Sequence, residues 1–174
     1  YTLLPAGRYQ LAITIDGQPI NGSPFETLVT PGATCAGSSQ LSGDGKDKAV
    51  AGQMATMLLT AVDCYGNMQT AGGDPWSVSL TRPGVTTVSA RVLDKADGTY
   101  ALSYNAAVSG LWQLHVMTGG AHADGSPFSV LIDPGPTDAH ASIAVGEGTS
   151  MAAIGETTTI MVRSKDHHRN DRGV

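Results

Sequence analysis

Three stretches decide the fold: Asp97-Gly98-Thr99-Tyr100-Ala101-Leu102-Ser103-Tyr104, Gly110-Leu111-Trp112-Gln113-Leu114-His115-Val116 and Gly125-Ser126-Pro127-Phe128-Ser129-Val130-Leu131-Ile132. In each stretch apolar side chains recur at every second position behind a glycine, which is the pattern of a β-strand with one face in a core. Gly98 supplies a backbone conformation that a tight turn requires. Pro127 lacks a backbone donor, which suits the start of a closing strand. We therefore expect three consecutive strands of an all-β domain.

Four further strands are expected before these three. One of them carries five alternating side chains on one face: Met54, Thr56, Leu58, Thr60 and Val62. Residues 76–81 and 88–92 alternate in the same way, and a first strand is expected at about residues 36–41. Seven short strands in roughly a hundred residues predict an immunoglobulin-like β-sandwich of two facing sheets. Its core is expected to hold four aromatic side chains: Trp76, Tyr100, Trp112 and Phe128.

The chain also repeats itself with an offset of 103 residues. The matches join Gly22-Ser23-Pro24-Phe25 to Gly125-Ser126-Pro127-Phe128, Pro31-Gly32 to Pro134-Gly135, Gly43 and Gly45 to Gly146 and Gly148, and Asp63 and Asn67 to Asp166 and Asn170. A period of this length is typical of whole domains in series. We expect the end of one repeat at residues 1–33, a complete repeat at 34–135 and the start of another at 136–174. Because Tyr1 lies within an expected strand, we expect the natural N-terminus to lie upstream.

The three opening stretches resemble the second half of a filamin repeat, in which DGTY, a strand behind a glycine, and GSPF follow one another. The turn Asp63-Cys64-Tyr65-Gly66-Asn67, with Gly72-Gly73 behind it, resembles the turn after the second strand of the same family. The resemblance covers the whole chain and implies tandem filamin-type (E-set) repeats. The chain departs from the family pattern where Trp112 replaces a tyrosine and where Arg169 replaces a glycine.

Composition excludes several classes of protein. The chain has 174 residues, 22 of them Gly and 9 Pro, and a net charge of -5 at pH 7. This acidic balance, without a basic stripe, argues against nucleic-acid binding. No apolar run approaches the ~20 residues that cross a bilayer. We therefore expect many turns, no nucleic-acid partner and no membrane span in this piece.

No organised catalytic or metal site is visible. The five histidines occur without a nucleophile elbow, an HExxH pattern or a phosphate-binding loop. His167 and His168 are adjacent, and neighbouring residues of a strand point to opposite faces, so a shared metal ion is not expected. We predict no enzyme activity, no catalytic residues, no metal and no cofactor.

Cys35 and Cys64 are the two cysteines, and both lie in the middle unit. If the first two strands pair antiparallel about a turn near Ala49 and Val50, the two thiols lie opposite each other. A disulfide is then possible, and free buried thiols are the alternative. A disulfide would favour a secreted array, because disulfides are rare in the cytosol.

The family resemblance also implies a partner site. Partner peptides of filamin repeats add as an extra strand in the groove between the third and fourth strands. This implies that outward-facing side chains line such a site here, namely Ser77, Ser79, Ser89 and Arg91. Backbone hydrogen bonds at the sheet edge would supply the affinity for proteins or peptides. The alternative is a plain solvated face.

Three functions follow from the resemblance. The first is a scaffold of a filamin-like protein in the cytoplasm or cytoskeleton, which reaches actin only through a domain outside this chain. The second is an extracellular cell-surface adhesion ectodomain built from the same repeats, which predicts the disulfide. The third is an accessory array attached to an unrelated catalytic domain. The residues themselves leave all three open.

Overall fold

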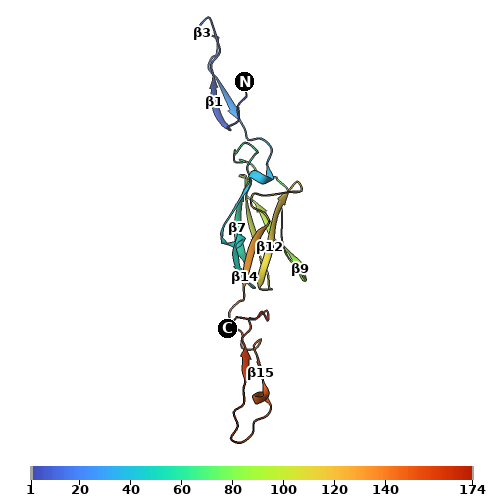
Figure 1. Ribbon diagram of the computed structural model, residues 1–174. Coiled ribbons are helices and arrows are strands. Elements are labelled where there is room, and N and C mark those ends of the chain that lie inside the picture. The colour runs from blue at the N-terminus through green and yellow to red at the C-terminus, as the bar shows by residue number, and fades with distance from the viewer. Residues whose placement is uncertain (1, 174) are drawn as a thin grey trace.

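The computed structural model describes residues 2–173 and has three parts in a row (Figure 1). A hairpin lies at the N-terminal end, a β-sandwich lies in the middle, and a second hairpin lies at the opposite end. Tyr1 and Val174, which begin and end the expected partial units, lie outside the described residues.

Two sheets make the sandwich. One has the strand order β10 (Arg91–Asp94), β11 (Thr99–Tyr104), β7 (Ala55–Thr60) and β5 (Gln40–Ser42). The other has the order β6 (Lys48–Val50), β14 (Phe128–Asp133), β12 (Gly110–Thr118), β8 (Ser77–Arg82) and β9 (Val85–Ser89), with β13 (Ala121–His122) beside β12. Neighbouring strands are antiparallel except for β6 and β14, which run parallel. The expected all-β immunoglobulin-like sandwich is confirmed.

The core lies between these two sheets and follows the alternation of each strand. Trp76, Tyr100 and Trp112 are buried as expected, and the rings of Trp76 and Tyr100 lie 6.3 Å apart at a tilt. Phe128, which we expected in the core, is only partly buried and packs against the core from the side. In strand β7 the side chain of Met57 is buried in the core. Met54, the first of the five side chains expected on one face of this strand, is 65% exposed.

The expected count of seven strands is not confirmed, because one expected strand is divided, another begins as a 3-10 helix, and β6 and β13 were not expected. Residues 88–92 fall partly in β9 and partly in β10, which belong to different sheets, and Ala90 lies between them. Residues 36–41 begin as the 3-10 helix η1 (Ala36–Ser38) before β5 starts. A second 3-10 helix, η2 (Asp44–Lys46), then leads the chain from β5 in one sheet to β6 in the other. At both places the chain crosses between the sheets at the rim of the sandwich.

Two turns show why the residue type matters. Gly98 has φ +83°, and a Cβ at this position would collide with the backbone carbonyl of Gln69, so both the turn and the packing require glycine. Gly66 has φ +87°, while Arg169, its counterpart 103 residues later, has φ +66°. The arginine therefore adopts a left-handed conformation that is strained for a residue with a side chain.

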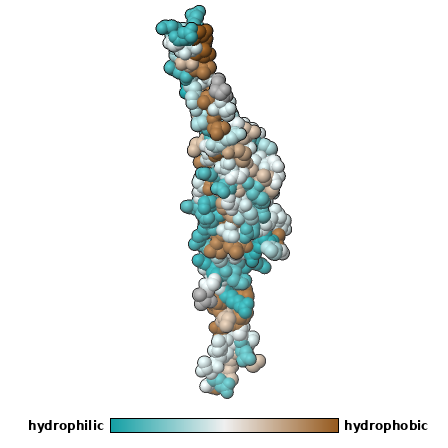
Figure 2. All heavy atoms as spheres, turned by 45° about the horizontal axis from the view of Figure 1, so that its top comes forward, coloured by the Kyte–Doolittle hydropathy of each residue, from teal (hydrophilic) through white to brown (hydrophobic). Residues whose placement is uncertain are grey.

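The two outer parts are hairpins with much exposed apolar surface. The first pairs β1 (Gly7–Leu11) with β4 (Phe25–Val29) and has a small tip of β2 (Thr14–Ile15) and β3 (Gln18–Pro19). The second pairs β15 (Ile143–Val145) with β16 (Met161–Arg163), and the 3-10 helix η3 (Glu147–Thr149) lies between them. Figure 2 shows brown, hydrophobic surface on the first hairpin, where Ile15 is 67% exposed. Neither hairpin has a second sheet against it within residues 2–173.

No helix among residues 2–173 is long and apolar enough to cross a membrane.

Candidate functional site

The candidate partner site lies at the edge of the sandwich formed by β8 and β9. Three of the four residues expected there come together. Ser79 on β8 pairs with Ser89 on β9, and Ser77 lies two residues before Ser79 on the same strand. Ser79 also pairs with His115 on its other side, so it belongs to the interior of the sheet. Ser77 and Ser89 are exposed.

Strand β9 covers the edge that a partner strand was expected to join. The chain folds back after β8 and pairs β9 with it, with an irregularity between Leu80 and Arg82. On this side the free edge of the sheet is therefore β9 itself, while β6 forms the other edge. The backbone N–H of Ala90 donates to the carbonyl of Val78 at 3.0 Å, and neighbouring residues of a strand direct their N–H groups to opposite sides. The N–H of Ser89 thus points away from β8, toward the free edge.

The structure places Arg91 apart from the three serines. It begins β10 in the other sheet, where it pairs with Ser103, and it is exposed. Strand β10 is the edge strand of that sheet. Since β9 and β10 are joined through Ala90 alone, the two sheet edges follow each other directly along the chain. The expected site is thus two adjacent edges rather than one groove lined by four side chains.

A polar cluster on the outer face of the same sheet lies beside Ser79. The hydroxyl of Thr81 hydrogen-bonds the ring of His115 at 3.0 Å, and the rings of His115 and His122 lie 5.7 Å apart. The ring of His122 hydrogen-bonds the hydroxyl of Ser126 at 2.9 Å. The alternation along β12 turns His115 away from the core, whereas the return of His122 through β13 has no comparable signal in the sequence.

The contact between Ser126 and His122 has a structural explanation. The Ser126 hydroxyl accepts the backbone N–H of Val116 at 2.9 Å and so closes the turn before β14. Among residues 2–173, no group of three or more His, Cys, Asp or Glu side chains is close enough to hold a metal ion.

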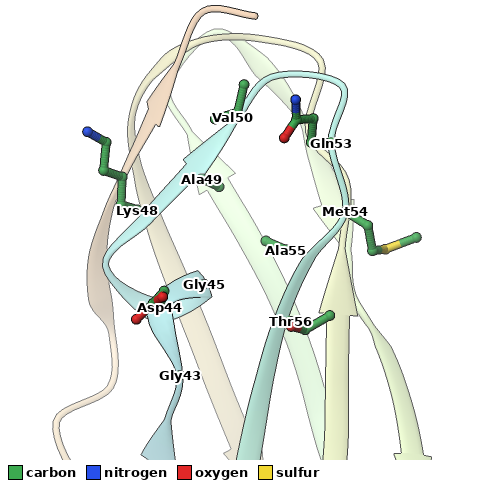
Figure 3. A pocket seen from close by; sticks show the side chains of 10 residues that line it. All are labelled: Gly43, Asp44, Gly45, Lys48, Ala49, Val50, Gln53, Met54, Ala55 and Thr56. Carbon is green, nitrogen blue, oxygen red and sulfur yellow. The ribbon is translucent and has the colours of Figure 1, made fainter.

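A pocket of about 490 Å³ opens on the opposite rim, between β6, β7 and η2 (Figure 3). Its wall includes Lys48, Gln53 and Met54, and the Lys48 ammonium lies 2.8 Å from the carboxylate of Asp133. Figure 3 shows the Lys48 and Met54 side chains on opposite sides of the opening and pointing outward. No cluster of converging charged groups lines this pocket within the part of the chain that the structure describes.

Tyr104 contacts Gly45, one of the residues that line this pocket. Its hydroxyl donates to the carbonyl of Gly45 in η2 at 2.7 Å, and burial raises the pKa of Tyr104 to about 12. The phenol therefore remains a neutral donor throughout the physiological pH range.

Cys35 and Cys64 are joined by a disulfide in the structure, and their Cα atoms lie 5.1 Å apart. Cys35 directly precedes η1, and Cys64 lies in the turn that follows β7, next to Asp63. Next to them, Thr34 and Asp63 form an isolated antiparallel bridge. The two cysteines therefore lie at the N-terminal end of the sandwich, where the preceding hairpin joins it.

Comparisons with known proteins agree with this architecture. Residues 33–129 match the family described as Filamin/ABP280 repeat. Over 162 residues the chain is 30% identical to Filamin-C of Rattus norvegicus, with 90% of this chain and 5% of that protein covered. The chain thus spans only a small part of this relative's length.

Two solved structures are similar in fold. The Lin-41 filamin domain aligns with 23% identity and a TM-score of 0.53, over 60% of this chain and 100% of that chain. The adhesin FdeC of Escherichia coli aligns with 22% identity and a TM-score of 0.65, over 94% of this chain and 51% of that chain. At these identities the two likenesses concern the fold alone.

Proposed function

Because the chain belongs to the Filamin/ABP280 repeat family, whose repeat is a non-catalytic scaffold and protein-binding fold, we propose that it is a stretch of tandem array that binds extended peptides by strand addition at β9. The boundaries of the units in this proposal are residues 1–33, 34–135 and 136–174. The observation that carries the proposal is the outward-pointing N–H of Ser89 on an edge strand. Such an unpaired row of backbone groups can accept another strand.

The proposal modifies the site that the family resemblance implies. In this chain β9 already occupies the edge of β8, so a partner peptide has two ways to bind. It adds to the outer edge of β9, or it displaces β9 and pairs with β8 directly. Ser89 would contact the peptide in the first case, whereas Ser77 and Ser79 would contact it in the second case, in which Ser89 leaves the sheet with β9. Arg91, at the start of the adjacent edge β10, is available for a charged group of the peptide.

A test should therefore change Ser89 rather than Ser79. Proline at Ser79 would break the interior of a sheet, because Ser79 pairs with strands on both sides. Ser89→Pro removes one outward N–H and leaves the bond from Ala90 to Val78 in place. Arg91→Ala is the companion variant that removes a side chain without altering the backbone.

The experiment measures NMR amide shifts of the full chain against a library of synthetic ten-residue peptides of varied sequence. We expect shifts along β9 for the peptides that bind, loss of binding in Ser89→Pro, and a weaker effect in Arg91→Ala. Thermal unfolding checks that Ser89→Pro remains folded. Shifts that cluster at the pocket of Figure 3 would contradict the proposal. Binding that survives in Ser89→Pro, with shifts along β8, would contradict addition at β9 and favour displacement of β9.

The parent protein has two candidate settings. The similarity to Filamin-C supports a cytoskeletal scaffold, in which actin is reached through a domain outside this chain. The Cys35–Cys64 disulfide supports the second candidate, an extracellular adhesion ectodomain, because such bonds persist in oxidising compartments. The redox state of these two cysteines in protein taken from its native source distinguishes the candidates.

A further inference from the structure

The turn that follows β7 is closed around one buried carboxylate. Asp63 accepts hydrogen bonds from the backbone N–H groups of Tyr65 and Asn67 at 2.9 and 2.8 Å. The side-chain amide of Asn67 donates to it at 2.8 Å, and so does the N–H of Gly32 from the connecting segment. Asp63 is 1% exposed. These bonds hold the Asn67 side chain in one orientation at the end of the sandwich.

The Asn67 amide then joins the sandwich to the preceding hairpin. Its Nδ2 donates to the carbonyl of Leu4 at 2.8 Å, and its Oδ1 accepts the N–H of Ala6 at 2.7 Å. A primary amide has both a donor and an acceptor, so it pairs with a short extended segment much as a backbone peptide group does. Neither a carboxylate nor an ammonium could form both bonds.

The same set of contacts recurs at the other end of the sandwich, with every residue number larger by 103. Asp166 is again 1% exposed and accepts from His168, Asn170 and Gly135. Asn170 Nδ2 donates to the carbonyl of Ala107 at 2.8 Å, and Asn170 Oδ1 accepts the N–H of Ser109 at 2.9 Å.

At this second end, the segment that Asn170 binds contains Ala107 and Ser109 and lies between β11 and β12 of the complete repeat. The Arg82 guanidinium donates to the carbonyl of Ser109 and anchors the same segment from within the sandwich. The bound segment is therefore held on both sides, by its own repeat and by the next one.

We propose that the turn 63–67 and its counterpart 166–170 are repeat-docking sites, each of which binds the segment before β1 or before β12 in the preceding repeat through the asparagine amide. The partner of each site is another repeat of the same kind. Two junctions with the same bonds impose the same relative orientation, so each added repeat extends the array by the same step. The array is then a rod of defined geometry rather than a string of independently tumbling domains.

The bonds at the second junction provide the test, because Ser109 lies in the complete repeat. Amide hydrogen exchange of the full, isotope-labelled chain is measured for the parent and for Asn170→Ala. We expect exchange of the Ser109 amide to become about tenfold faster, the effect of losing one net hydrogen bond. Asn105→Ala is the matched control, since its side chain donates to the carbonyl of Gly52 within the same repeat. The control should leave the exchange of Ser109 unchanged.

Nitrogen-15 relaxation in the same samples shows whether each hairpin tumbles together with the sandwich. In the parent, we expect amides of β15 and β12 to share one tumbling time, and Asn170→Ala should shorten that of β15 alone. Asn67→Ala is the independent variant at the first junction, where the Ala6 amide and β1 are the reporters. Unchanged exchange of Ser109 and Ala6 in the respective variants, or hairpins that already tumble independently in the parent, would overturn the proposal.

Discussion

The ring of His167 lies 3.1 Å from the carboxylate of Asp138, at the two positions equivalent to the disulfide of Cys35 and Cys64. Asp138 is the counterpart of Cys35 and His167 that of Cys64, each 103 residues further along the chain. The neighbouring bridges are equivalent too, since Thr137 pairs with Asp166 as Thr34 does with Asp63. The hydrogen bond from His167, followed by that from the N–H of His140, lowers the pKa of Asp138. The same two positions are thus joined by a disulfide at Cys35 and Cys64 and by a hydrogen bond 103 residues later.

The first prediction is that this position accepts a second disulfide. Asp138→Cys combined with His167→Cys should oxidise spontaneously in air, because the backbone around both residues matches that around Cys35 and Cys64. Thiol titration of the unreduced double variant should find no free thiol. The single variant Asp138→Cys should show one. Two free thiols in the double variant would mean that the repeats differ in backbone geometry here.

The second prediction concerns the native pair. Thiol titration of the intact, unreduced protein should detect neither Cys35 nor Cys64. Reduction should lower the free energy of unfolding by ~3–4 kcal/mol, the usual effect of opening a loop of this length, as measured by denaturant unfolding. The double variant Cys35→Ser with Cys64→Ser should start at the lower stability and not respond to reductant. Two titratable thiols in the native protein would remove the support for an extracellular setting.

The third prediction is a loss of stability in acid that depends on Asp63. Burial alone would raise its pKa, but hydrogen bonds from Asn67, Gly32 and Tyr65 outweigh this and lower the pKa from 3.8 to about 2. Since the folded state prefers the ionised form, this stabilisation is complete above pH 3.8 and is lost as the pH falls toward about 2. Denaturant midpoints from pH 5 to 2 should fall less steeply in Asp63→Asn than in the parent. If the denaturant midpoints of both proteins fell equally with pH, ionisation of Asp63 would not contribute to the loss of stability in acid.

The fourth prediction concerns the strained turn at Arg169. Arg169→Gly should stabilise the turn by about 1 kcal/mol, because glycine adopts a positive φ without a steric penalty. Slower exchange of the Asn170 amide, which donates to Asp166 at 2.9 Å, is the measurement. Gly66→Arg is the matched reverse change at the first junction and should accelerate exchange of the Asn67 amide. Effects of the same sign in both variants would contradict this explanation.

Much of the architecture was accessible from alternation and turn residues. The strands around Tyr100, Trp112 and Val130 were predicted because each shows one apolar face behind a glycine, and the structure buries that face. The division of residues 88–92 was not predicted, because Val88 and Val92 face the core from whichever sheet their strand joins. Alternation in the sequence indicates which side chains face the core, but it does not indicate which of the two sheets a strand joins.

The candidate sites were less predictable for a related reason. Ser77, Ser79 and Ser89 lie on the neighbouring strands β8 and β9, and their role in binding stays a prediction. The covering of β8 by β9 depends on how the turn at Gly84 folds back. Asp63 and Asn67 were visible as matches in the 103-residue repeat. The partners of the Asn67 side chain beyond its own turn are the backbone atoms of Leu4 and Ala6, and backbone atoms leave no signature in a sequence.

The parallel pairing of β6 with β14 has a mechanical consequence. The carbonyl of Asp47 accepts from Leu131, and the carbonyl of Asp133 accepts from Ala51. The last strand of the sandwich, β14, is thus linked side by side to β6, which follows β5 near the start of the sandwich. The two hairpins lie at opposite ends of the sandwich (Figure 1). A pulling force applied between the two hairpins would therefore slide β6 and β14 past each other. Their hydrogen bonds are loaded together in shear and cannot be opened one at a time, as they would be if the strands were peeled apart.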